Sequence, residues 1–284
     1  FTSHNHIDVV ALQQLCQFHI DAGTDGILVC GTTGEGALLD LSEFELAVKT
    51  VVNYCHDQVI VYAGTGSNNP KEAVEMTLLA ESLGVSGTLH AFGYYLKPNN
   101  KSIIRQFQTI HDASQKDIML YDIPGRNAVS LSLETLDEIY KLPRVVATKD
   151  ATADMARSMQ CKNLINQPNF CYYSGDDFSA LAFRAQGGHG CISVASNIFP
   201  KLIKKMHQLF NEQKIQEAMI IQQQLMPLYE LLFVEPNPCG VKYALSVMGL
   251  CEATVRAPFI ELEHDTKLAI DDCIKAVRKF EQSL

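Results

Sequence analysis

The chain has 284 residues, of which 47% are apolar, and this length is sufficient for one large hydrophobic core or two modest ones. Its 23 basic and 32 acidic residues give a net charge of −9, which argues against a nucleic-acid-binding surface and against an anionic membrane partner. No apolar run approaches the roughly 18 residues that cross a bilayer. The first residues, FTSHNHIDVV, lack the cationic and apolar parts of a signal peptide. We therefore expect a globular, cytoplasmic protein.

The cysteines indicate neither disulfides nor a metal site. They are odd in number, widely separated and never arranged as C-x-x-C, which is typical of reduced thiols buried as small apolar residues. No metal-binding motif such as H-E-x-x-H is present, so we expect no metal. The nine cysteines are residues 16, 30, 55, 161, 171, 191, 239, 251 and 273.

Short apolar segments rich in β-branched residues alternate with longer helical patterns along the first 200 residues. Helix signals lie between them: Ser42 is the expected cap of one helix, and Pro70 and Gly84 mark the start and end of the next. Repeated strand and helix predict a parallel sheet. The seven predicted strands are residues 26–30, 58–64, 85–91, 117–123, 144–149, 170–175 and 190–194.

From about residue 198 the pattern is helical only. Seven βα units are one strand short of an eight-stranded barrel, and an open barrel seam would expose unpaired backbone groups. We therefore predict a (β/α)8 TIM barrel over residues 1–197 whose first strand precedes Phe1. Residues 198–284 are expected to form the last barrel helix and a C-terminal helical extension. An open doubly wound sheet is the alternative.

The glycine-rich turn CGTTGEGALLD, residues 30–40, follows one strand and precedes a helix. Its spacing is neither the dinucleotide fingerprint nor a Walker motif, so we expect no nucleotide. Thr32 and Thr33 offer backbone N–H groups and hydroxyls near a helix N-terminus, an arrangement that suits a small carboxylate. The alternative is a capped loop whose threonines form local hydrogen bonds only.

Lys149 ends the predicted strand RVVATK, and Val145 and Ala147 lie on the same strand face. In parallel βα folds, catalytic groups come from the carboxyl ends of strands. A partly desolvated lysine is more readily neutral, and a neutral amine can attack a carbonyl to form an imine. The alternative is a lysine that extends to solvent from the strand edge.

The neighbouring strand ends strengthen the interpretation of Lys149 as catalytic. Tyr121 ends another strand, Arg126 lies in the loop after it, and Tyr94 and Tyr95 lie in the loop after a third. Hydroxyl groups can pass protons to and from a carbinolamine, and a guanidinium can bind a carboxylate with two hydrogen bonds. Together these residues indicate carbonyl chemistry on anionic substrates.

Several motifs occur in the order and spacing of one enzyme superfamily. They are GTTGE at 31–35, GYY with KP at 93–98, YDIPGR at 121–126, TKDAT at 148–152, SGDD at 174–177 and GCISVASN at 190–197. This pattern, over essentially the whole chain, resembles the pyruvate-dependent class I aldolases and, among them, the dihydrodipicolinate synthase family. The resemblance implies a TIM barrel that condenses pyruvate with L-aspartate 4-semialdehyde in lysine biosynthesis, without metal or organic cofactor.

The resemblance also implies a role for each matching residue. Lys149 would form the Schiff base with pyruvate, and Tyr121 would relay protons beside the imine. Thr33 and Tyr95 would complete the relay, with Tyr95 entering the site of a neighbouring subunit in a homotetramer built as a dimer of dimers. The backbone at Thr32 and Thr33 would bind the pyruvate carboxylate.

Further implications concern the second substrate and regulation. Arg126 would bind the carboxylate of L-aspartate 4-semialdehyde, and the pocket would be lined by Gly175 and Ile192. Family members inhibited by lysine bind it between subunits, and Asn68, Glu72 and Tyr94 match that site. At two other positions of the same site, where lysine-sensitive relatives often carry histidine or another polar group, this chain has Leu41 and Phe44.

Other functions remain open at this stage. N-acetylneuraminate lyase and the keto-deoxy sugar acid aldolases share the lysine and tyrosine, although Thr32 and Arg126 favour the synthase. The chain departs from the family at Asn127-Ala128, where Thr-Gly is common, and at Leu96, where Asn is common. A non-catalytic barrel that binds a carboxylate is the alternative from a different class.

Overall fold

The computed structural model describes residues 1–284 and contains seven strands, twelve α-helices and three short 3-10 helices. All seven predicted strands are confirmed, each within a few residues of its expected bounds. The chain divides into two compact units, residues 60–192 and residues 1–59 with 193–284. The predicted boundary at residue 197, between the barrel and the C-terminal helical extension, stays a prediction.

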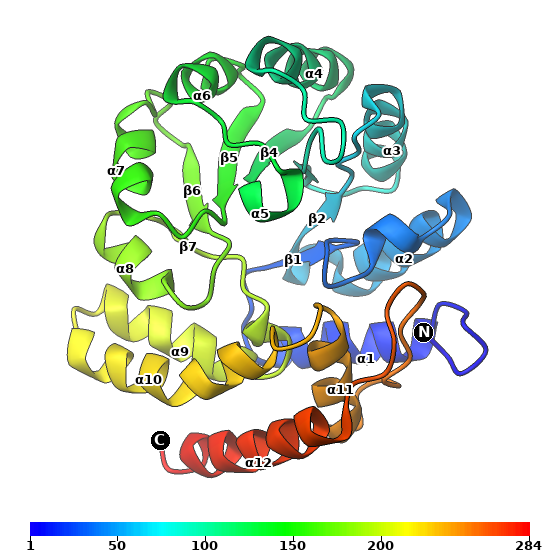
Figure 1. The fold of residues 1–284 in the computed structure, drawn as a ribbon, viewed down its shortest axis with the longest axis vertical. Helices are drawn as coiled ribbons and strands as arrows, with labels where there is room; N and C mark the ends of the chain where they lie inside the picture. Colours follow the sequence, from blue (N-terminus) through cyan, green and yellow to red (C-terminus); the bar gives the residue numbers. More distant parts are fainter. The chain divides into compact units, whose positions relative to one another are not determined.

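The unit of residues 60–192 contains a parallel sheet whose strands pair in the order of the sequence, as expected for repeated βα segments (Figure 1). Parallel neighbours bring the carboxyl ends of all strands to the same edge of the sheet. The strands are β2 (Ile60–Gly64), β3 (Gly87–His90), β4 (Asp117–Asp122), β5 (Val145–Asp150), β6 (Cys171–Ser174) and β7 (Gly190–Cys191).

Apart from α5, which directly follows β4, the helices of this unit lie along the outer side of its strands (Figure 1). Between helices and sheet, Phe92, Phe107, Ile118 and Leu120 are fully buried in one apolar core. The helices are α3 (Pro70–Ser82), α4 (Asn100–Ala113), α5 (Pro124–Asn127), α6 (Leu133–Tyr140), α7 (Met155–Asn163) and α8 (Ala180–Ala185).

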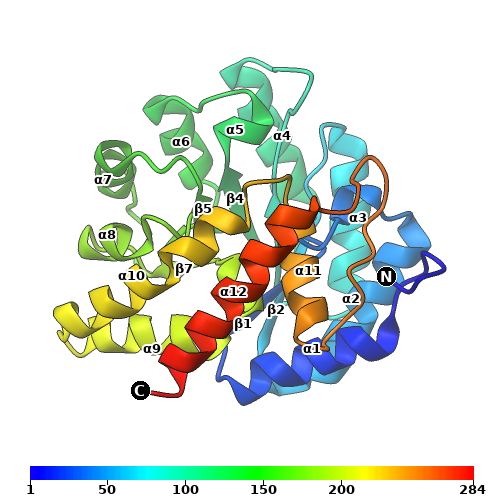
Figure 2. The same ribbon diagram turned by 60° about the horizontal axis from the view of Figure 1, so that its bottom comes forward.

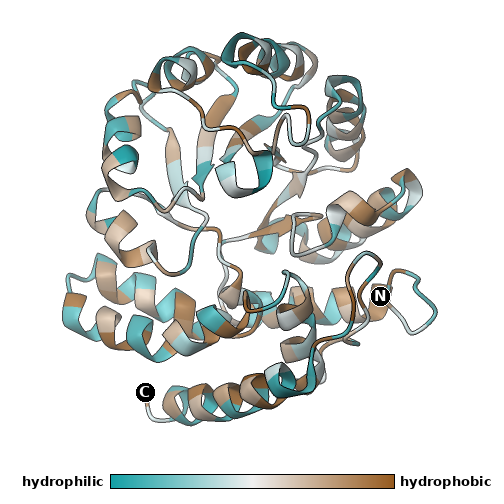
Figure 3. Cartoon of the chain, in the orientation of Figure 1, coloured by the Kyte–Doolittle hydropathy of each residue, from teal (hydrophilic) through white to brown (hydrophobic).

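The other unit is mostly helical, and its helices pack as pairs: α1 with α2, α9 with α10, and α12 with both α10 and α11 (Figure 2). Apolar and polar residues alternate along α9 and α12 (Figure 3), as in helices that bury one face. Its elements are α1 (Val9–Asp21), β1 (Gly26–Val29), η1 (Gly36–Leu38), α2 (Leu41–Cys55), η2 (His56–Gln58), η3 (Ala195–Asn197), α9 (Pro200–Asn211), α10 (Ile215–Leu231), α11 (Cys239–Val247) and α12 (His264–Glu281).

The predicted helix boundaries are partly right. Pro70 occupies the first turn of α3, and Gly84 follows its end with φ +95°. Ser42 does not cap α2, because Asp40 is the N-cap and accepts a 2.9 Å hydrogen bond from the Glu43 N–H. The Glu43 carboxylate in turn accepts from the Asp40 N–H, which completes a capping box. Ser42 instead donates to the Asp40 carboxylate.

No helix of the chain combines the length and apolar character that a membrane span requires.

Candidate active site

Strand pairing places Tyr121, Lys149 and Tyr173 side by side. Tyr121 of β4 is in register with Lys149 of β5, which is in register with Tyr173 of β6. Because side chains alternate along a strand, these three positions share one face of the sheet. The strand β5 continues to Asp150, so Lys149 is its penultimate residue and not, as predicted, its last.

Lys149 is buried, with only 7% of its surface exposed. Its Nζ lies 4.4 Å from the centroid of the Tyr121 ring, which provides a cation–π contact while the amine is protonated. Gly175, just after β6, leaves space for the lysine stem: a Cβ there would lie 2.9 Å from Lys149 Cε. The Gly175 N–H donates to the Asp150 carbonyl at 2.6 Å, so the approach of the two strands is fixed.

The residue after Lys149 anchors the strand on its opposite face. One Asp150 carboxylate oxygen accepts hydrogen bonds from the Thr152 N–H and hydroxyl at 2.8 and 2.7 Å. The other accepts from the Tyr172 hydroxyl at 2.5 Å. Burial, together with the Asp150 charge, raises the pKa of Tyr172, so this phenol remains a donor. Lys149 is therefore attached to a backbone held on both sides.

Arg126 lies in the short helix α5, so the prediction that it lies in a loop is wrong. Its backbone N–H donates to Ile123, and its exposed side chain forms no ion pair, which leaves the guanidinium available. At the end of α5, Ala128 has a left-handed backbone with φ +55°. Such a conformation favours glycine over residues that carry a Cβ. Ile192 follows β7, and its N–H donates to Ser174.

Tyr95 is highly exposed, with 88% of its surface accessible. It lies in the loop after β3, in which Gly93, Tyr95 and Lys97 all have positive φ. Leu96 beside it is 62% exposed. Tyr95 is therefore presented outward. Positive φ at the non-glycine residues Tyr95 and Lys97 costs free energy, so the surrounding structure must hold the loop in this conformation.

The predicted lysine-site residues lie near one another around the N-terminus of α3. The Asn68 side chain donates to the Tyr94 carbonyl at 3.2 Å. The Glu72 carboxylate accepts from the Ser67 hydroxyl and the Asn69 amide, both at 3.0 Å. Asn69, and not Asn68, is the N-cap of this helix. The carboxylate of Glu72 is therefore already bound within its own helix start.

The turn that contains Thr32 and Thr33 is closed by hydrogen bonds from the Glu35 N–H to Thr32 and from the Gly36 N–H to Gly31, each 3.1 Å long. Neither bond uses the N–H of Thr32 or Thr33, the two groups that are predicted to bind a carboxylate. Glycine is required at position 36, because a Cβ there would lie 2.0 Å from the Cys30 carbonyl oxygen.

Residues from the end of the chain hold this turn in place. Glu35, which is 3% exposed and has φ +52°, accepts from Lys242 Nζ at 2.5 Å and from the Arg256 N–H at 3.0 Å. Arg256 also donates to the Leu38 carbonyl at 2.9 Å. The amide of Asn237 donates to the Thr33 hydroxyl oxygen at 3.0 Å. Sequence reasoning missed all of these contacts, because they join residues more than 200 positions apart.

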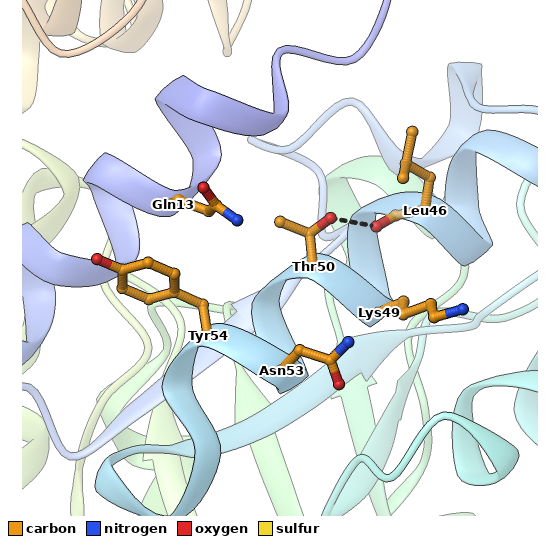
Figure 4. A pocket seen from close by; sticks show the side chains of 6 residues that line it. All are labelled: Gln13, Leu46, Lys49, Thr50, Asn53 and Tyr54. Carbon is orange, nitrogen blue, oxygen red and sulfur yellow. Dashed lines mark hydrogen bonds between the residues drawn. The ribbon is translucent and has the colours of Figure 1, made fainter.

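A shallow groove of about 390 Å³ lies between α1 and α2 and contains none of the predicted site residues (Figure 4). The Thr50 hydroxyl donates to the Leu46 carbonyl within α2, and Tyr54 donates to Gln17 on α1. The groove holds no cluster of titratable groups that would indicate chemistry. It is lined by Gln13, Leu46, Lys49, Thr50, Asn53 and Tyr54.

Comparison with known proteins supplies the context for this geometry. The sequence profile of the Dihydrodipicolinate synthetase family matches residues 1–277. The 4-hydroxy-tetrahydrodipicolinate synthase of Gluconobacter oxydans is 42% identical over 271 residues, which cover 95% of this chain and 91% of that protein.

Two solved structures extend the likeness to the fold. The chloride-inhibited dihydrodipicolinate synthase of Acinetobacter baumannii, complexed with pyruvate, gives a TM-score of 0.92 at 32% identity and covers 96% of this chain and 93% of that one. The enzyme from Cyanidioschyzon merolae with lysine bound gives 0.94 at 32% identity, covering 98% and 95%. These likenesses confirm the predicted fold class, an α/β barrel of the TIM type with a C-terminal helical region.

Proposed function

The chain belongs to the dihydrodipicolinate synthetase family, and from this premise we propose that it condenses pyruvate with L-aspartate 4-semialdehyde to form 4-hydroxy-tetrahydrodipicolinate, a step of lysine biosynthesis. The observation that carries this proposal is the environment of Lys149. It is a buried lysine without a carboxylate partner, next to a phenol, at the carboxyl end of a parallel strand. A lysine in this position is suited to form an imine with a keto acid.

The first step is covalent. Lys149 Nζ in its neutral form attacks the ketone carbon of pyruvate, and the carbinolamine loses water to give the imine. Loss of a proton from the methyl carbon then produces an enamine. The Tyr121 hydroxyl is the group we propose to move these protons, since its ring lies against the amine. Thr33 and Tyr95 are proposed to complete the relay.

The second step forms the carbon–carbon bond. The enamine carbon attacks the aldehyde carbon of L-aspartate 4-semialdehyde, and the aldehyde oxygen takes up a proton. The amine of the same substrate then attacks the imine carbon, which closes the ring and releases Lys149. Arg126 is proposed to bind the substrate carboxylate, and its unpaired guanidinium supports that role. No step requires a metal or an organic cofactor.

The turn at Thr32 and Thr33 is proposed to bind the carboxylate of pyruvate. The N–H groups of both residues are outside the two hydrogen bonds that close the turn. Gly175 and Ile192 are proposed to line the pocket. For Gly175 the clearance beside Lys149 supports an additional role, namely that it allows the lysine stem to extend.

Trapping of the imine tests the mechanism directly. The protein is incubated with pyruvate and borohydride, digested, and analysed by mass spectrometry. The expected result is a reduced pyruvyl adduct on the peptide that contains Lys149. An unmodified Lys149, or an adduct on another lysine, contradicts the proposal.

Replacement of Arg126 by alanine distinguishes the synthase from the sugar-acid lyases. We expect the variant to raise the KM for aspartate semialdehyde by roughly 100-fold, as for loss of a charge-assisted two-pronged contact, while pyruvate adduct formation persists. Turnover of N-acetylneuraminate by the unaltered protein should be undetectable. An unchanged KM, or faster turnover of the sugar acid, would assign the barrel to a different substrate.

We propose that the active form is a homotetramer built as a dimer of dimers, in which Tyr95 enters the site of a neighbouring subunit. The outward position of Tyr95 and Leu96 supports this arrangement. Analytical ultracentrifugation gives the oligomeric state, and mixing Tyr95→Phe subunits with inactive Lys149→Arg subunits tests for sharing. Activity recovered in mixed oligomers supports a shared site, whereas no recovery places Tyr95 in its own subunit's site.

Lysine is proposed as a feedback inhibitor that binds near Asn68, Glu72 and Tyr94, whose proximity to one another supports a common site. Calorimetry with free lysine should give a saturable signal that Glu72→Gln removes. No heat and unchanged activity at millimolar lysine would rule out this regulation.

The cytoplasm is the proposed compartment. All nine cysteines are unpaired, which fits a reducing environment.

A further inference from the structure

The Thr33 hydroxyl has a fixed partner within residues 1–59 and 193–284. Asn237, in the segment between α10 and α11, is 4% exposed, and its Nδ2 donates to Thr33 Oγ1 at 3.0 Å. The Asn237 Oδ1 is buried and has no hydrogen-bond partner. The amide therefore makes one contact with its side-chain nitrogen and leaves its oxygen unused, which is uncommon for a buried polar group.

The direction of this hydrogen bond determines where the hydroxyl hydrogen can point. A threonine hydroxyl has one hydrogen and two lone pairs, and the Asn237 N–H occupies one lone pair. The hydrogen must then point away from Asn237. We propose that Asn237 is a positioning residue that keeps the Thr33 hydroxyl hydrogen free for donation in the proposed proton relay. This inference rests on the proposed function.

The surrounding contacts make the arrangement rigid. Glu35, two residues after Thr33, is bound by Lys242 and by the Arg256 backbone, so the part of the turn that follows the threonine is also held in place. A donor that is fixed before the substrate binds requires no reorganisation during the reaction.

Rotation of the Asn237 amide by half a turn would reverse the hydrogen bond. The hydroxyl would then donate to Oδ1, and no hydrogen would remain for the relay. The two amide orientations predict opposite effects on activity when Asn237 is replaced by a residue whose side chain can only accept a hydrogen bond. Asn237→Asp is nearly isosteric and captures the hydroxyl hydrogen, whereas Asn237→Ala releases the hydroxyl to rotate freely.

We expect Asn237→Ala to lower kcat/KM roughly 10-fold, in line with the loss of one hydrogen bond. Asn237→Asp should lower it roughly 100-fold, in line with the loss of an aligned donor. The reverse order, or an Asp variant as active as the unaltered protein, would mean that the hydroxyl already donates to residue 237 and would overturn the inference.

A double substitution separates this role from a purely structural one. Thr33→Val removes the hydroxyl, so adding Asn237→Ala to it should cause no further loss of kcat/KM. A further loss near 10-fold would show that Asn237 acts independently of Thr33 and would overturn the inference. Circular dichroism of each variant verifies the fold, and the coupling measurement remains informative if the Asp variant does not fold.

Asn53 provides a matched control, since it lies on α2 in the open groove of Figure 4, away from the turn. Asn53→Ala and Asn53→Asp should leave kcat/KM unchanged. Borohydride trapping separates the two hypotheses. If the unaltered protein forms the Lys149 adduct but the Asn237 variants do not show the expected losses of kcat/KM, only the inference about Asn237 fails. If no adduct forms in the unaltered protein, both fail.

Discussion

The two regions that carry the proposed catalytic residues are held by different means. In residues 60–192, Tyr121 and Lys149 are neighbours in the register of a parallel sheet, so backbone pairing alone places their side chains together. In the turn at residues 31–36, hydrogen bonds from Asn237, Lys242 and Arg256 supply the support. The first region therefore rests mainly on backbone pairing, whereas the second depends on a few buried polar contacts.

The largest expected effect comes from removing the amine in the sheet region. Lys149→Arg retains a positive charge but cannot form an imine, because the guanidinium stays protonated. We expect kcat to fall by more than roughly 1,000-fold, as for loss of a covalent nucleophile, with no borohydride adduct. Lys116→Arg, at an exposed position in the same unit, should leave turnover unchanged. Turnover near the normal rate in Lys149→Arg would contradict the covalent mechanism.

The clearance around Lys149 gives the next largest effect. A Cβ at Gly175 would lie 2.9 Å from Lys149 Cε and 3.0 Å from Ala151 Cβ, so Gly175→Ala should displace the lysine. A displacement near 1 Å lowers kcat roughly 100-fold. Gly125→Ala is the matched control, since a Cβ at Gly125 meets nothing within 4 Å. Equal kcat values for the two variants in a steady-state assay would show that the lysine accommodates the methyl group.

Breaking the buried ion pair should destabilise the turn region. Lys242→Met leaves the Glu35 carboxylate, whose side chain is 1% exposed, without its charged partner. We expect the free energy of unfolding to fall by about 3 kcal/mol, as for removal of one partner of a buried pair. Denaturant titration measures the change.

Lys214→Met is the matched control for that experiment, because Lys214 and Glu212 form an exposed pair with 51% of each side chain accessible. Its removal should change the free energy of unfolding by less than about 0.5 kcal/mol. If both variants lose the same free energy of unfolding, the Lys242–Glu35 pair stabilises the protein no more than an ordinary surface pair does.

The smallest effect concerns the backbone after Arg126. Ala128 has φ +55°, a conformation that costs a residue with a Cβ about 1 kcal/mol or more, so Ala128→Gly should raise the free energy of unfolding by about 0.5 to 1 kcal/mol. Ala22→Gly should lower it instead, because Ala22 has a right-handed φ of −84°. A thermal unfolding series measures both, and a loss of stability in Ala128→Gly would show that no strain is relieved there.

The sequence predicted the strands well because their signals are local. Apolar β-branched runs mark each strand, and alternation along RVVATK predicted the shared face that contains Ala147 and Lys149. Errors occurred where two local signals competed. Asp40 and Ser42 are both good caps, and the capping box with Glu43 favoured Asp40. Arg126 was predicted in a loop because a single turn of helix after Pro124 has too few residues to show periodicity.

The amino-acid sequence by itself determined the βα order, the strand positions and the motifs that identify the family, because these depend on neighbouring residues and short periods. Only the tertiary structure decided that Asn237 contacts Thr33, that Lys242 and Arg256 bind Glu35, and that Gly175 makes room for Lys149. Contacts between residues 200 positions apart have no local pattern, since they arise when separately formed elements bury polar groups that must find partners.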